Sequence, residues 1–131
     1  YPALSWHGII TEVKKIKKGE FVGYDLTERL LRDTTAAILP VGYWHGFPRA
    51  LSSAGEVLIN GRRAKVLGRV SMDLLILDAT GIKCAIGDVA TLIGRNGKEI
   101  LPAGYMADRA GTTSYEYLTR LNPLMERRIV K

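Results

Sequence analysis

The sequence predicts a mainly β fold, with an antiparallel sheet that is closed on itself or folded into a sandwich. Three observations lead to this fold class. Short apolar runs alternate with turn residues about every ten positions, an Asn-Gly pair separates two of these runs, and a helix start signal occurs only late in the chain. With 131 residues, of which 47% are hydrophobic, the chain can bury its own core, so we expect residues 1–131 to form one domain.

The first predicted strands lie before Pro40. Residues 9–16 are expected to form a strand that ends at Lys17-Lys18-Gly19, and the next strand begins at residues 21–22. Residues 34–39 form a third strand, which ends at Pro40 because proline has no N–H to donate to a sheet.

The clearest hairpin surrounds Asn60-Gly61. Residues 56–59 and 62–70 lie on either side of this pair, and Asn-Gly accepts the two positive φ angles of a type I′ turn. Residues 74–77 are a continuous apolar run, which is typical of a central strand.

A second hairpin is expected in the last third of the chain. Residues 89–93 return through the turn Arg95-Asn96-Gly97-Lys98 to Ile100. At the end of the chain, residues 128–130 are expected to return as an edge strand.

Helices are expected only near the C-terminus. Thr113-Ser114-Tyr115-Glu116 has the spacing of a capping box, so a short helix is expected to run from there to Leu121. Asn122-Pro123 ends it, and a helical turn is expected near residues 105–109.

Composition argues against several classes of protein. Cys84 is the single cysteine and His7 and His45 are isolated, so we expect neither a disulfide framework nor a metal site. No run of eighteen apolar residues and no signal peptide is visible, so we expect no membrane association. The single cysteine fits a reducing compartment, and we expect a cytoplasmic protein.

The net charge of +6 raises a polyanion partner as an alternative. The basic residues gather at three turn-like places, residues 14–18, 62–63 and 127–128, and they form no single stripe with interleaved aromatic residues. We therefore expect no nucleic-acid partner. A stand-alone basic β-barrel module remains the second hypothesis, and a steep salt dependence of oligonucleotide binding would distinguish it.

Tyrosines and arginines beside glycine or proline are the candidates for chemistry. Tyr24, Tyr43 and Arg69 each follow a glycine, and Arg49 follows a proline. The pKa of a tyrosine is ordinarily near 10, so half-ionisation at pH 7 needs about 4 kcal/mol of help, which neighbouring arginines can supply. The ordinary alternative is that the tyrosine rings pack in the sheet with their hydroxyls at the surface.

Five blocks of sequence make the function more specific: FVGYDLTE, ILPVGYWHGFPRALS, VLINGRRAKVLGRVSMD, GDVATLIG and TTSYEYLTRLNP. In this order they resemble the C-terminal domain of alanine racemase, a family of enzymes that depend on pyridoxal 5′-phosphate. The resemblance runs from Pro2 to the end, and the second block followed by GRVSMD is its most specific part. It implies an antiparallel, Greek-key-like β-barrel with one or two short helices near the C-terminus.

The resemblance implies a racemase that uses two bases. In this family the C-terminal domain acts across a homodimer, on the cofactor held by the other subunit's N-terminal TIM barrel. Tyr24 is implied as the base that takes or returns the Cα proton on one face of the amino-acid substrate, and a barrel lysine serves the opposite face. No segment of this chain resembles the barrel, so we expect a fragment that is inactive alone.

The resemblance also implies binding residues. Tyr43, Arg49 and Arg69 are similar to residues that line the path of the substrate, where the arginines favour a carboxylate. The ordinary alternative for the arginines is pairing with surface acids.

Four further residues have expected roles. Ser71 and Met72 match the loop that faces the substrate, with the Met72 N–H binding its carboxylate, and Asp73 is expected to hold this loop by accepting hydrogen bonds. The ordinary alternative for Met72 is a place in the core. Tyr115 is similar to the tyrosine that contacts the cofactor phosphate of its own subunit.

Some positions depart from the family pattern. Trp44 and His45 stand where the family commonly has alanine and aspartate, Asp25 stands where it has glycine, and Ser71 where it has cysteine. We expect these changes to affect substrate preference more than the type of reaction. Alanine is the expected substrate, with D-alanine serving the bacterial cell wall, and serine or a broader range of amino acids is the alternative.

Overall fold

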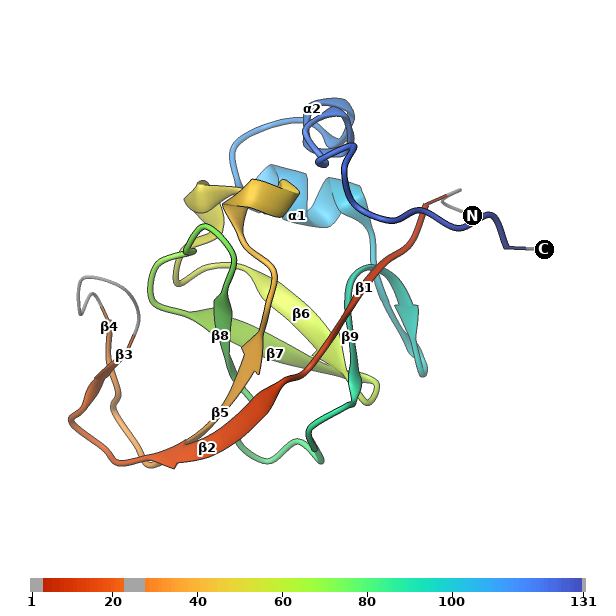
Figure 1. Ribbon diagram of the computed structural model, residues 1–131. Helices are drawn as coiled ribbons and strands as arrows, with labels where there is room; N and C mark the ends of the chain where they lie inside the picture. Colours follow the sequence, from red (N-terminus) through yellow and green to blue (C-terminus); the bar gives the residue numbers. More distant parts are fainter. Residues whose placement is uncertain (1–3, 23–27, 131) are drawn as a thin grey trace.

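The computed structural model describes residues 4–22 and 28–130 and shows a curved antiparallel sheet beneath a layer of short helices (Figure 1). The strands are β1 (Trp6–Ile9), β2 (Glu12–Ile16), β3 (Phe21–Val22), β4 (Glu28–Arg29), β5 (Thr34–Leu39), β6 (Glu56–Ile59), β7 (Arg62–Leu67), β8 (Leu75–Asp78), β9 (Val89–Asn96) and β10 (Glu99–Leu101). The helical elements are the 3₁₀ turns η2 (Tyr43–His45) and η3 (Arg49–Leu51) and the helices α1 (Ala103–Arg109) and α2 (Ser114–Thr119).

The strand order confirms the predicted closed antiparallel fold. The main sheet runs β1-β9-β6-β7-β8-β5-β2, with β10 on β9, and every pairing in it is antiparallel. Strands β1 and β2 lie at opposite ends of this order, although only Ile10 and Thr11 separate them in the chain. The two edges of the sheet therefore come together. Strand β1 pairs with β9 and β5 pairs with β8, and such pairings between strands far apart in the chain are typical of a Greek key.

The prediction of one strand over residues 9–16 was wrong at this corner. The Ile10 N–H donates to the Asp88 carbonyl over 2.9 Å, and the next N–H, of Thr11, donates to the Ile38 carbonyl over 3.0 Å. The chain thus changes its neighbour from β9 to β5 between two consecutive residues. Apolar alternation continues through such a corner, which is why the pattern does not reveal it.

The Asn60-Gly61 hairpin is confirmed, with φ angles of 47° and 76° at the two turn residues. Strand β7 ends at Leu67 and not at Val70 as predicted, because Gly68 has a φ of 71° and turns the chain out of the sheet. The second hairpin is also present, but β9 continues to Asn96, so its turn is shorter than predicted.

The predicted edge strand over residues 128–130 was wrong. These residues form no strand, and Ile129 and Val130 are 99% and 83% exposed. Two β-branched residues in a row favour extended backbone, but a strand also needs an edge to pair with.

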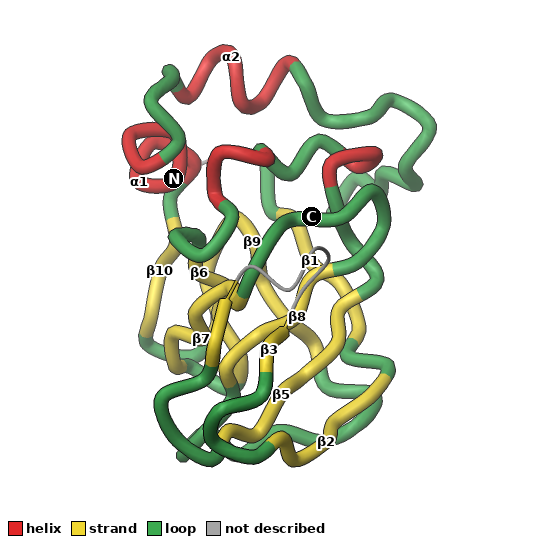
Figure 2. The backbone as a smooth tube through the Cα atoms, turned by 90° about the vertical axis from the view of Figure 1, so that its left-hand side faces the viewer, coloured by secondary structure: helices red, strands yellow, loops and turns green. Residues whose placement is uncertain are grey.

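Both predicted helices are confirmed as α1 and α2. The Thr113 hydroxyl caps α2 by accepting the Glu116 N–H over 3.1 Å. Figures 1 and 2 both place α1 and α2 at one end of the barrel. In the part of the chain that the structure describes, no helix is long and apolar enough to span a membrane.

An aromatic cluster packs α2 against the barrel. The Trp6 ring lies 6.5 Å from the Phe47 ring and 6.5 Å from the Tyr117 ring, measured between centroids. These side chains come from β1, from the loop after η2 and from α2, and all three are buried. Their packing fixes the loops at this end of the barrel, where the predicted site residues lie.

Candidate functional site

Two loops pack backbone against backbone at the helical end of the barrel. The Tyr43 N–H donates to the Ser71 carbonyl over 3.0 Å, and the Trp44 N–H donates to the Met72 carbonyl over 2.8 Å. Gly42 allows this approach, because a Cβ at that position would lie only 2.1 Å from the Ser71 oxygen. The two loops that carry Tyr43 and Met72 are thereby joined, and both side chains are about half exposed, so Met72 is not a core residue.

Arg49 connects this pair of loops to α2. Its guanidinium carbon lies 5.3 Å from the centroid of the Tyr43 ring, within cation–π range. Both residues line a groove of about 600 Å³, whose opposite wall includes Glu116 and Arg120. A groove of this volume has room for a small molecule.

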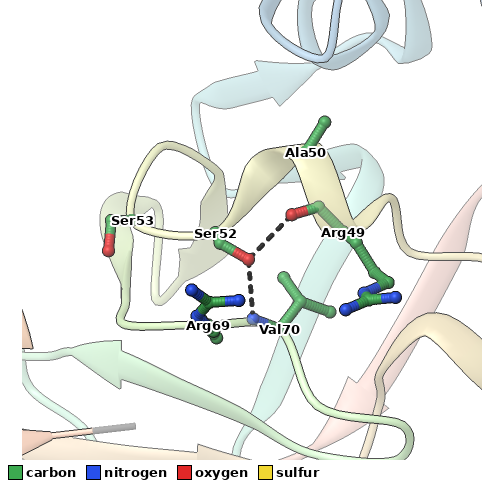
Figure 3. Close-up of a pocket in the computed structure, with 6 residues that line it drawn as sticks. All are labelled: Arg49, Ala50, Ser52, Ser53, Arg69 and Val70. Carbon is green, nitrogen blue, oxygen red and sulfur yellow. Dashed lines mark hydrogen bonds between the residues drawn. The ribbon is translucent and has the colours of Figure 1, made fainter. Parts of the chain in front are cut away.

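Arg49 and Arg69 both line a second hollow (Figure 3). Ser52 ties its two sides together, because its hydroxyl donates to the Arg49 carbonyl over 2.7 Å and accepts the Val70 N–H over 2.9 Å. The two arginines thus belong to one cationic surface, and Arg69 also interacts with other groups of the protein. Sequence analysis missed Ser52, although a serine three residues after the start of a helical turn often bonds back to its carbonyl.

Glu28 links Ser53, which lines this hollow, to Gly68, which precedes Arg69 in the chain. Its Oε1 accepts the Ser53 hydroxyl over 2.7 Å and the Gly68 N–H over 2.8 Å, and its Oε2 lies 3.4 Å from the Lys65 ammonium. Burial by itself raises the pKa of Glu28, but these hydrogen bonds and the Lys65 charge outweigh it, so the pKa lies below its ordinary value of 4.5. No signal in the sequence indicated this role.

The Glu28 interactions predict a pH dependence of stability. Because its pKa is lower in the folded chain, ionised Glu28 stabilises the fold above about pH 4.5, and this contribution is lost as the pH falls through the folded-state pKa. Glu28→Gln is expected to lower the unfolding free energy at pH 7 and to reduce its decline between pH 6 and pH 3, as measured by urea denaturation. The matched control is Glu12→Gln, which removes a pair with Lys14 that is half exposed on both sides. Equal pH dependence of Glu28→Gln and wild type would contradict the assignment.

Two further tyrosines, Tyr24 and Tyr115, were predicted for the site. Tyr24 lies outside the described residues. Tyr115 is the second residue of α2 and is 79% exposed, and it lines neither hollow. The structure therefore brings together Tyr43, Arg49, Arg69, Ser71 and Met72, and Tyr115 is not among the residues that line the two hollows.

Two other tyrosines have raised pKa values, and one of them, Tyr105, shows that neighbouring arginines are not sufficient to make a base. Tyr105 lies between the Arg63 and Arg109 guanidinium groups, at 4.9 and 5.2 Å from the ring centroid. Its hydroxyl donates to Glu56 over 2.8 Å, and this bond raises its pKa. Burial raises the pKa of Tyr117 as well. Neither is a candidate base at neutral pH.

The joined loops offer hydrogen-bond donors and positive charge to a carboxylate. The Met72 N–H makes no hydrogen bond to any other described residue, and Arg49 and Arg69 supply two guanidinium groups nearby. The residues that the structure describes contain no cluster of three or more His, Cys, Asp or Glu side chains that could hold a metal ion. The two hollows have no lysine in their walls, so their described residues are suited to contact a cofactor such as pyridoxal phosphate but not to hold it covalently.

Comparison with known proteins identifies similar sequences over almost the whole chain. The profile of the family described as "Alanine racemase, C-terminal domain" matches residues 3–129. The alanine racemase of Leptospira interrogans is 38% identical over 130 residues, which cover 98% of this chain and 33% of that protein. A protein of Enterococcus faecalis named amino-acid racemase is 44% identical over 111 residues, which cover 83% of this chain and 16% of that protein.

The fold is similar to solved structures as well. The crystal structure of alanine racemase from Bartonella henselae with covalently bound pyridoxal phosphate superimposes with a TM-score of 0.83 at 33% sequence identity. The match covers 89% of this chain and 32% of that one. The chain thus spans at most about a third of the length of each of these relatives.

Proposed function

Because the chain belongs to the alanine racemase C-terminal domain family, we propose that it is the C-terminal part of a racemase that interconverts L- and D-alanine. The main support is the joining of the loop that carries Tyr43 to the loop that carries Ser71 and Met72, beside the two arginines. In this proposal the rest of the enzyme holds pyridoxal phosphate. That part corresponds to the two thirds of the relatives' length that this chain does not match.

Racemisation at Cα needs a base on each face of the substrate, because one base that returned the proton to the same side would restore the starting enantiomer. Tyr24 serves one face, and a lysine outside this chain serves the other. Bound pyridoxal phosphate supplies an electron-withdrawing ring that stabilises the charge left at Cα. The other site residues of this chain bind and position the substrate.

The substrate carboxylate is held by the Met72 N–H and attracted by Arg49 and Arg69. Tyr43 lines the path to the site, and Ser71 shapes the loop beside it. Among the described residues no carboxylate forms an ion pair with the Arg49 guanidinium, which lies over the Tyr43 ring in the wall of the groove and can attract an anionic substrate.

The enzyme acts as a homodimer. Tyr115 donates a hydrogen bond to the cofactor phosphate of its own subunit, while Tyr24, Tyr43 and Met72 serve the cofactor of the partner. This division is supported by the absence of Tyr115 from the residues that line the two hollows and by its 79% exposure, which leaves the side chain accessible.

A broader substrate range is the second candidate. The Enterococcus faecalis relative is named amino-acid racemase rather than alanine racemase. Trp44, beside Tyr43, is 45% exposed where the family commonly has alanine. A large ring beside the path of the substrate is expected to change which side chains pass.

The test uses the complete natural protein that carries this sequence, with pyridoxal phosphate added. Incubation with L-alanine is expected to yield equal amounts of the two enantiomers, resolved by chiral chromatography, and L-serine and larger amino acids measure the range. The 131-residue chain under the same conditions is expected to be inactive. If no amino acid is interconverted, the proposed function is wrong, and activity of the short chain would show that the rest of the protein is not needed.

A further inference from the structure

The turn that carries Tyr43 satisfies every backbone N–H from Gly42 to Phe47. Five of these six groups donate to backbone carbonyl oxygens, at distances from 2.8 to 3.2 Å. The exception is Gly42, whose N–H donates to Nδ1 of His45 over 3.0 Å. One side chain thus completes the hydrogen bonding of the whole turn.

No other described group accepts a hydrogen bond from the Gly42 N–H. Gly42 is buried, and its backbone packs directly on the loop of Ser71 and Met72. A buried N–H without a partner is unfavourable, and the close packing leaves no room for the turn to move toward another acceptor. The His45 ring is therefore placed inside the turn by a specific bond, with its Nδ1 unprotonated and accepting.

The outer side of the same turn is held independently of the His45 ring. Asn122 donates from its side chain to the Trp44 carbonyl over 2.9 Å and from its backbone N–H to the His45 carbonyl over 3.0 Å. These bonds need only backbone atoms of the turn. Substitution of His45 is consequently expected to loosen the side of the turn that faces Ser71 and to leave the Asn122 side attached.

We propose that His45 is a positioning residue, which accepts the Gly42 N–H and so fixes Tyr43 against the loop of Ser71 and Met72. This inference rests on the proposed function, in which Tyr43 lines the path of the substrate and Met72 binds its carboxylate. It assigns His45 no contact with the substrate. The Trp44 ring packs edge-on against the imidazole, with centroids 4.9 Å apart, and is the residue of this pair that faces solvent.

Two substitutions of His45 distinguish the effect of its hydrogen-bond acceptor from the effect of its ring. His45→Phe keeps a flat ring and has no acceptor, whereas His45→Asn has no ring but places Oδ1 two bonds from Cβ, as Nδ1 is in histidine. Hydrogen exchange of a peptide that begins at least two residues before Gly42, such as residues 38–48, measured by mass spectrometry on the complete protein, includes the Gly42 N–H. We expect exchange about fivefold to tenfold faster in His45→Phe, which corresponds to the loss of one hydrogen bond, and near wild type in His45→Asn.

The kinetic test uses the same two variants. We expect His45→Phe to raise the KM for alanine about fivefold to tenfold with a smaller change in kcat, and His45→Asn to restore the wild-type KM. Equal exchange and equal KM in the two variants would overturn the inference. A changed preference among amino acids in both variants would also overturn it, because it would show that the ring contacts the substrate. If the wild-type protein racemises no amino acid, the proposed function is wrong, and exchange at Gly42 still decides whether His45 caps the turn.

Discussion

Gly42→Ala is expected to lower the unfolding free energy by about 3 kcal/mol or more, because the new methyl group cannot be accommodated without separating two loops. Its carbon would lie 2.1 Å from the Ser71 carbonyl oxygen and 2.6 Å from the backbone nitrogen of Asp73. Both are backbone atoms, so no side-chain rotation relieves the contact. The loops must move apart, and the hydrogen bonds from the Tyr43 and Trp44 N–H groups are lost with that movement.

The matched control is Gly104→Ala. Gly104 lies in α1, and a Cβ there would meet nothing within 4 Å. Alanine is favoured over glycine inside a helix, so this variant is expected to be as stable as wild type or about 1 kcal/mol more stable. Urea denaturation followed by circular dichroism measures both changes. If Gly42→Ala unfolds at the wild-type urea concentration, the two loops are not packed as described.

Short sequence motifs correctly predicted a turn and a helix cap, because these features depend on residues that are close together in the chain. Asn60-Gly61 forms its turn because both residues adopt positive φ, and Thr113 caps α2 because its hydroxyl is one turn from an N–H. The corner at Ile10 and Thr11 depends on which strands lie on either side, and that is information from residues far away in the chain. The same limit applies to residues 128–130, whose pattern suits a strand but which form none, because strand formation also depends on a partner elsewhere in the chain.

The residues of the candidate site were also predicted only in part. Resemblance to the family named Tyr43, Arg49 and Met72, and the structure places them at one end of the barrel. Glu28 was missed because its partners are 25 to 40 residues away in sequence. His45 was noticed as a departure from the family pattern and was expected to bear on substrate preference. Its contact with Gly42 offers a different explanation, in which the imidazole serves the turn.

Tyr24→Phe is expected to reduce racemisation in the complete protein about 10²-fold to 10⁴-fold, the range that general acid–base groups contribute. The variant keeps the aromatic ring and removes the hydroxyl that would take or return the Cα proton. Absorbance of the bound cofactor is expected to stay as in wild type, because the rest of the enzyme holds it. Tyr115→Phe is the comparison variant, since it removes a hydroxyl assigned to the cofactor phosphate and none assigned to Cα. It is expected to weaken cofactor binding and to affect the two enantiomers equally.

Exchange of the Cα proton with deuterated solvent distinguishes a base on one face from a general loss of activity. Wild-type enzyme is expected to exchange the Cα proton of both alanine enantiomers, as followed by proton NMR. In Tyr24→Phe, one enantiomer loses exchange, while the other keeps it because the lysine on the opposite face still takes its proton. An equal loss for both enantiomers would mean that the substitution disturbs the site as a whole, and unchanged exchange would mean that another group is the base. Either result would count against Tyr24 as the base of one face, because only the asymmetric loss is expected of a two-base racemase in which this chain supplies one base.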